Sequence, residues 1–586
     1  MTITVSKLVL KNYRSCPDLI VEFSRYTALV GYNNSGKSNL LAALSWLLKK
    51  YSLPAAEFWD EREPVSVSGE LKDIDEADLA LLNDRAQAQI APFIVEGTLT
   101  IRRSQPHPDA KASELSFEVL DPGTGAWRSN PTGIDNALGV LLPEPIKIGA
   151  MEDAEEDATK AKTSTTIGKL LAEFTDAIQQ AHSEELNRHL REVSRRISST
   201  GDERIAELGV IDEGINSKLQ DIFPGMSVRL HFDVPDVSTL IKTGTLRVKE
   251  NDGVERDFGS YGHGAQRSIQ MTLVRHLAEV KRGHRVGGTT LLLVDEPELY
   301  LHPFAIEQAR AALKQLSLHG YQVVFSTHSA QLIQPEDAQH VLLVRKLANG
   351  QTTVRKRLRD ALDVVVPDAQ HQTEHLFSLS NASQFLFADA VLVIEGKTER
   401  KLLPAMYQSH TQKSLGQNKI AIISLDGTTN LSRTLRILGE LDLPTKAIVD
   451  LDYAFTRATA DGFLEELDPD LTSLKLTLVD MGRNGEITID QRTQLPMKGI
   501  QGGAAEAYVL LAARADAEEA IERLHLRLLQ HGIWLWTRGA IEPHLGLSGK
   551  NEAAWARFQK KILEESYSAA CGNDAKALQL IDWIAT

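Results

Sequence analysis

Residues 31–38 read Gly-Tyr-Asn-Asn-Ser-Gly-Lys-Ser, a spacing of residue types that can hold a nucleoside triphosphate. The glycines let the backbone curl with its N–H groups directed at phosphate oxygens, and the N-terminus of a following helix adds partial positive charge. The lysine reaches the β- and γ-phosphates, and the last serine ligates Mg²⁺. A flexible glycine turn is the alternative, but an apolar strand before the loop and a helix after it favour ATP binding. The residues assigned to ATP are Gly31, Asn34, Gly36, Lys37 and Ser38, with Ser38 also a metal ligand.

Two apolar runs farther along the chain end in residues suited to ATP hydrolysis. The run 289–294 ends in Asp295 and Glu296. Asp295 is placed to hold Mg²⁺ through water, and Glu296 to orient or deprotonate the attacking water. The run 320–327 ends at His328, where an imidazole can sense the γ-phosphate. The run that ends in Asp295 and Glu296 could be an ordinary strand end, but the phosphate loop upstream favours a nucleotide site. For His328, a lone histidine is weak evidence, and its position at the end of a second buried strand carries the inference.

A Ser-Gly-rich turn lies between these motifs, with the sequence Ser-Tyr-Gly-His-Gly-Ala-Gln-Arg at residues 260–267. The turn leads into a helical pattern over residues 268–278, and it offers an anion a hydroxyl, backbone N–H groups and a helix N-terminus. Ser260, Gly262 and Gly264 are therefore candidate ATP contacts.

Carboxylates gather again in the C-terminal part of the chain. Glu395 ends an apolar run, and Gly396 allows a tight turn into a helix that carries Glu399. Asp450 and Asp452 are predicted to stand two apart on one strand, so that their side chains leave the same face. Because several carboxylates at the ends of parallel strands repel one another, we expect divalent cations among them.

Length and composition limit the classes of protein to which the chain can belong. The chain has 586 residues, of which 42% are hydrophobic, and this size predicts two or three domains. Cys16 and Cys571 are the two cysteines, too few for a disulfide framework or a cysteine-rich zinc site, and they indicate a reducing cytoplasm. We expect no export signal or membrane span. The formal net charge of −15 argues against a uniformly basic coat for nucleic acid but leaves room for a local basic channel.

The elements that position the N-terminal motifs follow from hydrophobic periodicity. A helix is expected over Asn39–Lys49, directly after the phosphate loop. The acidic run Glu152–Asp157 is interpreted as a solvated loop and not as a metal site. The expected strands of this part are Lys7–Tyr13, Leu19–Phe23, Tyr26–Val30, Phe93–Ile101 and Leu115–Leu120.

Apolar residues step by three and four over residues 167–197 and again over 205–219, which predicts two amphipathic helices in a hairpin. Two interpretations remain open at this point. The hairpin could be a dimer arm, or it could be a helical layer packed on its own domain.

A basic β-hairpin is predicted from His340–Lys346 and Thr353–Arg359, on either side of Asn349-Gly350. Its cations could follow a phosphate backbone or could protect an edge strand from aggregation, and the sequence favours neither. The side chains concerned are Arg345, Lys346, Arg355, Lys356, Arg357 and Arg359.

The order of Arg14-Ser15, the phosphate loop, the 260–267 turn, Asp295-Glu296 and His328 resembles an ABC-type ATPase of the SMC/RecF-like branch. The form Ser-x-Gly-x-Gly-x-Gln-Arg is similar to that of the OLD (overcoming lysogenisation defect) family. The resemblance implies that Arg14 belongs to the ATP site. It also implies that the 260–267 turn of one subunit closes over ATP bound to another, so that the protein is at least a dimer.

The C-terminal carboxylates, with a strand expected between them, resemble a Toprim domain, the metal-dependent phosphodiester module of topoisomerases, primases and certain nucleases. By that resemblance Glu395, Glu399, Asp450 and Asp452 bind the metals. The family also has a later acid and a lysine. For the acid Glu542 is the first candidate and Glu506 the second; the lysine is Lys550, which could stabilise a charged transition state. Ala540 stands where the family shows Ser, and a plain surface role for Glu542 and Lys550 stays open.

The expected fold is α/β: an ABC-type ATPase domain with a helical dimerisation insertion, followed by a Toprim α/β domain with a parallel sheet. The expected boundaries are 1–160 and 226–375 for the ATPase, 161–225 for the insertion and 385–586 for the Toprim domain.

The resemblance implies an ATP-regulated DNA nuclease, endo- or exonucleolytic, with Mg²⁺, Mn²⁺ or Ca²⁺ at the Toprim site. It implies a role in phage exclusion or antiphage defence, a cytoplasmic location without a membrane partner, and room for a partner helicase. The alternative is a RecF- or SMC-like DNA clamp that does not cleave. Strand passage and priming are disfavoured because neither a nucleophilic-Tyr domain nor a Cys-based zinc module is recognisable.

Overall fold

The computed structural model describes residues 3–129, 140–141, 145–149, 166–237, 246–250, 252–281, 289–360, 382–425, 427–497 and 503–586. The backbone contacts divide the chain into two compact units. The first unit comprises residues 1–29, 36–332 and 346–352, and the second comprises residues 30–35, 333–345 and 353–586.

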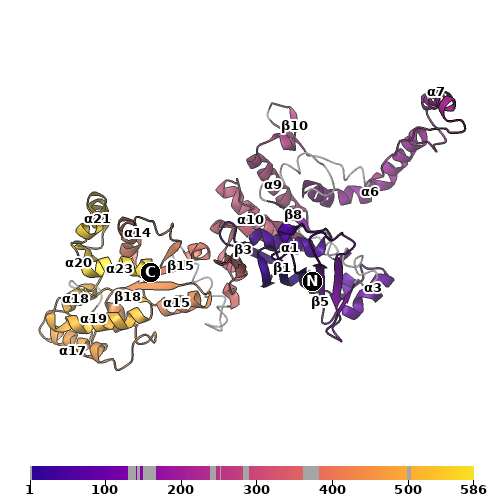
Figure 1. The fold of residues 1–586 in the computed structure, drawn as a ribbon. Coiled ribbons are helices and arrows are strands. Elements are labelled where there is room, and N and C mark those ends of the chain that lie inside the picture. Colours follow the sequence, from indigo (N-terminus) through magenta and orange to yellow (C-terminus); the bar gives the residue numbers. More distant parts are fainter. Residues whose placement is uncertain are drawn as a thin grey trace. The chain divides into compact units, whose positions relative to one another are not determined.

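An antiparallel sheet with the strand order β2-β1-β4-β5-β6-β7 forms one layer of the first unit (Figure 1). Buried and half-buried side chains alternate along β4 and β5, as expected for a sheet with one covered face. The strands are β1 (Thr4–Tyr13), β2 (Cys16–Glu22), β4 (Val65–Lys72), β5 (Leu99–Gln105), β6 (Ser116–Leu120) and β7 (Trp127–Ser129).

The sheet that carries the ATP motifs has the strand order β14-β13-β3-β12-β11-β8. Its strand β11 runs parallel to both β8 and β12. Every residue of β3 and β12 is buried, as expected for strands covered on both faces. The strands are β3 (Tyr26–Val30), β8 (Ile146–Ile148), β11 (Thr290–Val294), β12 (Tyr321–Thr327), β13 (Leu342–Lys346) and β14 (Thr352–Val354).

Helix α1 (Lys37–Leu48) lies between these two sheets, in contact with β1, β4 and β5 on one side and with β11 and β12 on the other. Its apolar side chains are buried all round, which explains why the segment after the phosphate loop has no polar face. The fully buried residues include Leu40, Leu41, Leu44, Trp46 and Leu47.

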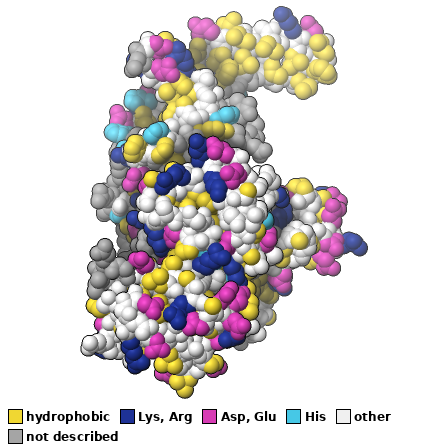
Figure 2. Space-filling model, turned by 90° about the vertical axis from the view of Figure 1, so that its left-hand side faces the viewer, with side chains coloured by type: hydrophobic (Ala, Val, Ile, Leu, Met, Phe, Trp, Pro, Cys, Tyr) yellow, Lys and Arg dark blue, Asp and Glu magenta, His cyan; other side chains and the backbone are white. Residues whose placement is uncertain are grey.

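Helices α6 (Thr166–Ile197) and α7 (Ala206–Ile222) occupy the two predicted helical segments, but the described residues of the two helices do not pack along each other as a hairpin. Helix α6 contacts β8 and helix α9 (His263–Lys281), whereas α7 lies at the far end of α6, away from both sheets (Figure 1). Hydrophobic side chains gather on this projecting part, at the top of Figure 2. The projecting arrangement is therefore the one that the structure adopts.

The remaining helices of the first unit surround its sheets. They include α2 (Glu76–Leu79), α3 (Asp84–Ile90) and α10 (Pro303–Ser317), and α10 packs against α9 and β12. A short antiparallel pair, β9 (Arg247–Lys249) and β10 (Glu255–Asp257), precedes α9.

The second unit is built on a fully parallel sheet with the strand order β16-β15-β17-β18. Its strands are β15 (Ala390–Ile394), β16 (Ile420–Ser424), β17 (Thr445–Val449) and β18 (Ile533–Leu535). Helices cover both faces, as a parallel sheet requires (Figure 1). On one face lie α14 (Lys397–Thr411), α20 (Ile541–Leu545), α21 (Glu552–Glu564) and α23 (Ala575–Ala585); on the other lie α15 (Leu431–Glu440), α17 (Pro469–Arg483), α18 (Ala504–Ala512) and α19 (Ala515–Gln530).

The chain leaves the adjacent strands β15 and β17 toward opposite faces of this sheet. Strand β15 continues into α14 on one face, whereas the helices that follow β17 lie on the other (Figure 1). Such a reversal opens a crevice beyond the carboxyl ends of the two strands, which is where α/β proteins bind ligands. Glu395 and Asp450 directly follow these two strands.

The expected α/β fold class is confirmed, but three predicted elements differ. Residues 93–98 are not part of a strand, because Glu96 and Gly97 adopt left-handed conformations and form a turn that ends before β5. Strand β14 ends at Val354, so the basic residues after it do not lie on a strand. Strand β17 ends at Val449, and Asp452 begins the short helix α16 (Asp452–Thr456), so Asp450 and Asp452 do not project from one strand face.

No helix in the described ranges combines the length and the apolar character needed to cross a membrane. The acidic run 152–157 lies outside the described residues.

Candidate active sites

The residues predicted to handle ATP form one connected network in the first unit. Lys37 Nζ lies 2.9 Å from His328 Nε2, and the same ring nitrogen lies 3.1 Å from Glu296 Oε1. The Ser38 hydroxyl donates to Asp295 Oδ2 at 2.8 Å. Lys37, His328 and Glu296 thus form one contact group, and Ser38 and Asp295 form a second. The Ser326 hydroxyl joins the two groups, because it donates to Asp295 Oδ1 and accepts from the Glu296 N–H.

Two glycines of the phosphate loop leave no space for a side chain. A Cβ on Gly36 would lie 2.1 Å from Thr352 Oγ1, and φ of Gly36 is 107°, in the left-handed region. A Cβ on Gly31 would lie 2.2 Å from the Val344 carbonyl oxygen. Asn34 also has a positive φ of 62°. The loop therefore needs glycine at both positions.

Arg14 lies beside the start of α1. Its Nη2 donates to Glu57 Oε1 at 2.7 Å, its Nε donates to the other oxygen of that carboxylate, and its Nη1 donates to Asn39 Oδ1 at 3.1 Å. Asn39 in turn donates to the Ser15 hydroxyl at 2.7 Å. The sequence did not predict this role of Glu57, because the segment that carries Glu57 has no hydrophobic periodicity.

The Ser-Gly-rich turn lies at the surface of the first unit. Ser260 and Gly262 are exposed, and the Ser260 hydroxyl donates to the Asp257 carbonyl at 2.6 Å. Helix α9 begins at His263, earlier than the predicted start at residue 268, so Gly264 lies in its first turn. The structure thus presents this helix N-terminus outward and not to the phosphate loop of its own chain.

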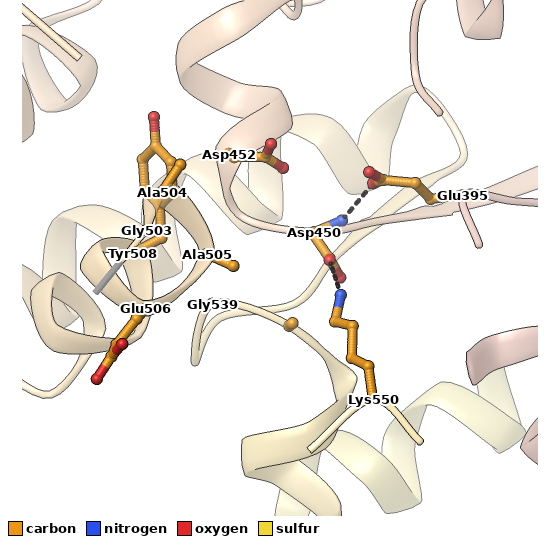
Figure 3. Close-up of a pocket in the computed structure, with 11 residues that line it drawn as sticks. Glu395, Asp450, Asp452, Gly503, Ala504, Ala505, Glu506, Tyr508, Gly539 and Lys550 are labelled. Carbon is orange, nitrogen blue, oxygen red and sulfur yellow. Dashed lines mark hydrogen bonds and ion pairs between the residues drawn. The ribbon is translucent and has the colours of Figure 1, made fainter. Parts of the chain in front are cut away.

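The carboxylates of the second unit line a pocket of about 490 Å³ (Figure 3). Glu395, Asp450 and Asp452 face it, and Lys550 enters from the opposite side. The backbone N–H of Asp450 donates to Glu395 Oε2 at 3.1 Å, and Lys550 Nζ donates to Asp450 Oδ2 at 3.0 Å. With Glu506 at its rim, the pocket therefore combines four acids with one cation.

Glu399 and Glu542 are buried next to this cluster, with 4% and 6% of their surface exposed. The Thr398 hydroxyl donates to Glu542 Oε1 at 2.8 Å, and Lys550 Nζ lies 3.8 Å from Glu542 Oε2. Thr398 was not singled out from the sequence, although it stands beside Glu399 in the same motif.

The two candidates for the later acid are placed differently. Glu506 is exposed at the pocket rim, and its carboxylate points away from Asp450 and Glu395 (Figure 3). Glu542 instead shares Lys550 with Asp450. The geometry therefore favours Glu542, and the alternative of a plain surface residue does not apply to it because it is buried.

Burial is the largest influence on the pKa values of Glu395, Glu399 and Asp450. It raises the pKa of Glu395 to about 8, with further increases from the negative charges of Asp450 and Asp452. Burial and the charge of Asp450 likewise raise the pKa of Glu399 to about 8. Burial raises the pKa of Asp450 to about 6 against the opposing effect of Lys550. The metal-free cluster thus resists full ionisation near neutral pH.

A divalent cation fits these residues. Asp450 Oδ1 and Glu542 Oε2 are buried with no hydrogen-bond partner among the described residues, and the donors are all carboxylate oxygens, which suit Mg²⁺, Mn²⁺ and Ca²⁺. In the described part of the chain no three His, Cys, Asp or Glu side chains are already arranged as a metal site; Lys550 lies between Asp450 and Glu542 instead.

Two of the basic residues in and after β13 make contacts inside the second unit. Arg345 is 6% exposed and donates to the carbonyl oxygens of Leu386 and Ala388, both at 3.1 Å. Lys356 forms an ion pair with Glu440 at 3.0 Å. Arg345 is therefore not available to a phosphate backbone, and the hypothesis of a continuous phosphate track is wrong at that position.

Comparison with known proteins gives matches along the whole chain. A family model described as "Overcoming lysogenization defect protein-like, TOPRIM domain" matches residues 386–452, and one described as "AAA ATPase domain" matches residues 3–96 and 147–333. The "Old nuclease" of Escherichia phage P2 is 36% identical over 572 residues, which is 97% of each chain.

Two more distant relatives are also similar. An "OLD nuclease" of Thermus scotoductus is 21% identical over 76% of this chain and 82% of its own. "Endonuclease GajA" of Bacillus cereus is 20% identical over 68% of this chain and 66% of its own.

We expect Mg²⁺ to stabilise the protein more at about pH 8 than at about pH 6. In the folded, metal-free protein Glu395 and Glu399 keep their protons up to a pKa of about 8, whereas their ordinary value is 4.5. Metal-free stability therefore falls as the pH rises through that window, while cation binding, which needs ionised carboxylates, becomes more favourable. The gain in melting temperature on adding Mg²⁺ should be larger by about 3 °C or more at the higher pH.

The Glu395→Gln/Asp450→Asn double variant is the control for this measurement, and its Mg²⁺-induced gain should be small at both pH values. Equal gains for the wild type at the two pH values would contradict the account of the carboxylate cluster.

Glu542→Gln should lower metal-dependent phosphodiester cleavage by about tenfold or more, because Glu542 lies beside Lys550 and Asp450 in the cluster. Glu506→Gln is the matched control and should stay within about twofold of the wild type. Initial rates at saturating Mg²⁺ give the comparison. The reverse ranking of the two variants would make Glu506 the functional acid.

Proposed function

This chain belongs to the OLD (overcoming lysogenisation defect) family of nucleases, and from that premise we propose that its Toprim centre hydrolyses DNA under the control of its ATPase. The chain is an ATPase and a nuclease. The observation that carries the proposal is the cluster of Glu395, Asp450 and Lys550 beyond the carboxyl ends of β15 and β17. The separate ATP network on the same chain supports the proposal that the ATPase controls cleavage.

The Toprim residues would share the work of phosphodiester cleavage. Glu395, Glu399, Asp450 and Asp452 would hold divalent cations, with Mg²⁺ as the first candidate and Mn²⁺ or Ca²⁺ as alternatives. When bound, such a cation supplies a Lewis acid that withdraws charge from the scissile phosphate.

Lys550 suits a role toward the substrate. Burial lowers the pKa of Lys550, but the surrounding acids outweigh burial and raise this pKa above its ordinary value, so Lys550 keeps its proton. Its side chain is about half exposed at the pocket. A fixed positive charge there would stabilise the negative charge that develops on the phosphate in the transition state. In the metal-free protein the same ammonium neutralises Asp450.

The ATP network supports hydrolysis of ATP at the first unit. Lys37 would bind the phosphates, Ser38 and Asp295 would hold Mg²⁺, and Glu296 would orient or deprotonate water. His328, which contacts both Lys37 and Glu296, would sense the γ-phosphate by direct contact. Arg14, Gly31, Asn34 and Gly36 complete the proposed ATP contacts.

We propose that the protein acts as a homodimer or a higher oligomer. The outward-facing turn with Ser260, Gly262 and Gly264 would close over ATP held by a partner subunit. The projecting helices support dimerisation, because α7 and the segment after it carry exposed apolar side chains (Figure 2). The most exposed of them are Val210 (69%), Ile222 (70%), Phe223 (55%) and Met226 (57%).

DNA as the substrate, a role in phage exclusion or antiphage defence, and a cytoplasmic location belong to the same proposal. The nuclease names of the relatives support a nucleic acid as the substrate, and the two buried free cysteines, Cys16 and Cys571, support a reducing compartment. The defence role follows from the family resemblance alone. Endonucleolytic and exonucleolytic cleavage both remain open, as does a partner helicase. The domain boundaries at residues 160, 225, 375 and 385 also remain predictions.

Cleavage of supercoiled and linear DNA tests the proposal. The Glu395→Ala/Asp450→Ala double variant should lose about a hundredfold or more of the wild-type rate in Mg²⁺ or Mn²⁺, because it removes the acids that would hold the cation. Lys37→Ala should abolish ATP hydrolysis.

Each outcome of that experiment assigns a function. If the double variant cleaves DNA as fast as the wild type, the nuclease site is not in this pocket. ATP hydrolysis without any DNA cleavage by the wild type would favour the alternative, a RecF- or SMC-like clamp. If Lys37→Ala still cuts DNA, ATP controls targeting and not the chemistry.

Val210→Glu combined with Phe223→Glu should weaken the dimer by about a hundredfold or more, because buried charge replaces two apolar anchors. Light scattering over a dilution series measures the mass. The matched control is Ile20→Glu, which alters a residue that is 57% exposed on β2 and should leave the mass unchanged. A wild-type mass at every concentration for the arm variant would place the dimer contact elsewhere.

A further inference from the structure

Arg267 lies near the start of α9 and is only 3% exposed, although arginine side chains are rarely buried. Its Nη1 donates to the Gly149 carbonyl oxygen at 2.9 Å, and its Nη2 donates to the carbonyl oxygens of Asp295 and Glu296, both at 2.7 Å. One side chain therefore ties α9 to the segments that follow β8 and β11.

Glu296 has a backbone conformation that needs such support. Its φ is 48°, in the left-handed region that is unfavourable for a residue with a side chain. Arg267 holds its carbonyl group, and the Ser326 hydroxyl accepts a hydrogen bond from its N–H at 3.0 Å. With the backbone held in this way, the carboxylate lies 3.1 Å from His328 Nε2, inside the ATP network.

The helix that carries Arg267 also carries the Ser-Gly-rich turn at residues 260–266. The side-chain amide of Gln266 donates to the Tyr261 carbonyl at 2.7 Å, so the turn is fixed to α9 one residue before Arg267. A displacement of the turn would therefore move the guanidinium relative to the carbonyl groups of Asp295 and Glu296.

We propose that Arg267 is a positioning residue that holds Glu296 in its hydrolytic conformation and makes that conformation depend on the turn at residues 260–266. The inference rests on the proposed role of Glu296 in ATP hydrolysis. Arginine suits the task because its planar fork offers separate N–H donors to several carbonyl oxygens at once. A lysine, with a single nitrogen, reaches fewer of them.

The test is ATP hydrolysis by Arg267→Met and Arg267→Lys, with binding of a fluorescent ATP analogue measured in parallel. Arg267→Met should lower kcat by about tenfold or more while KM and analogue binding change by less than about threefold, and Arg267→Lys should fall between it and the wild type. Unchanged analogue binding also reports that the variants fold. The matched control is Arg275→Met, which alters an exposed arginine of α9 that donates to Gln308 at 2.9 Å and should keep the wild-type kcat.

A double-variant cycle separates positioning from a general structural effect. If Arg267 acts through Glu296, adding Arg267→Met to Glu296→Gln lowers kcat no further. A full additional loss would overturn the inference, and so would a raised KM with unchanged kcat in Arg267→Met. If Arg267→Met keeps the wild-type kcat while Glu296→Gln is inactive, only the inference about Arg267 is overturned. If Glu296→Gln hydrolyses ATP at the wild-type rate, the proposed role of Glu296 itself is overturned.

Discussion

The burial of like charges in the second unit is the interaction on which the rest of that unit depends. The adjacent parallel strands β15 and β17 bring Glu395 and Asp450 together, and Glu399 is buried beside them. Burial raises the pKa of all three groups, so the folded, metal-free protein holds them at a cost in free energy that Lys550 offsets only in part. Such a cluster lowers the stability of the metal-free fold, and this loss is expected of a site that binds a cation.

Both centres of the chain follow from one rule of parallel sheets. Polar side chains come directly after buried strands, where neighbouring strands end at the same edge. In the first unit β11 and β12 deliver Glu296 and His328 in this way, and in the second β15 and β17 deliver Glu395 and Asp450. The first centre has an additional feature, since Arg267 connects the Glu296 backbone to a turn at the surface.

Much of this organisation could be predicted from the sequence, because long apolar runs and short motifs report buried strands and the residues that end them. The prediction failed where local conformation decided the outcome. Asp452 was expected on a strand, but the chain turns into a helix after Val449. Other contacts depend on tertiary structure alone. Arg267 reaches carbonyl groups that are 118 and 29 residues away in the chain, and no periodicity encodes such a contact.

We infer that the buried acids of the Toprim pocket exchange protons for divalent cations. Isothermal titration calorimetry with Mn²⁺ near pH 7, in buffers of different ionisation enthalpy, measures that exchange directly. The account predicts the release of about one proton or more per protein, because Glu395 and Glu399 have pKa values of about 8 before the cation binds. Cation binding to the same pocket without proton release would contradict it.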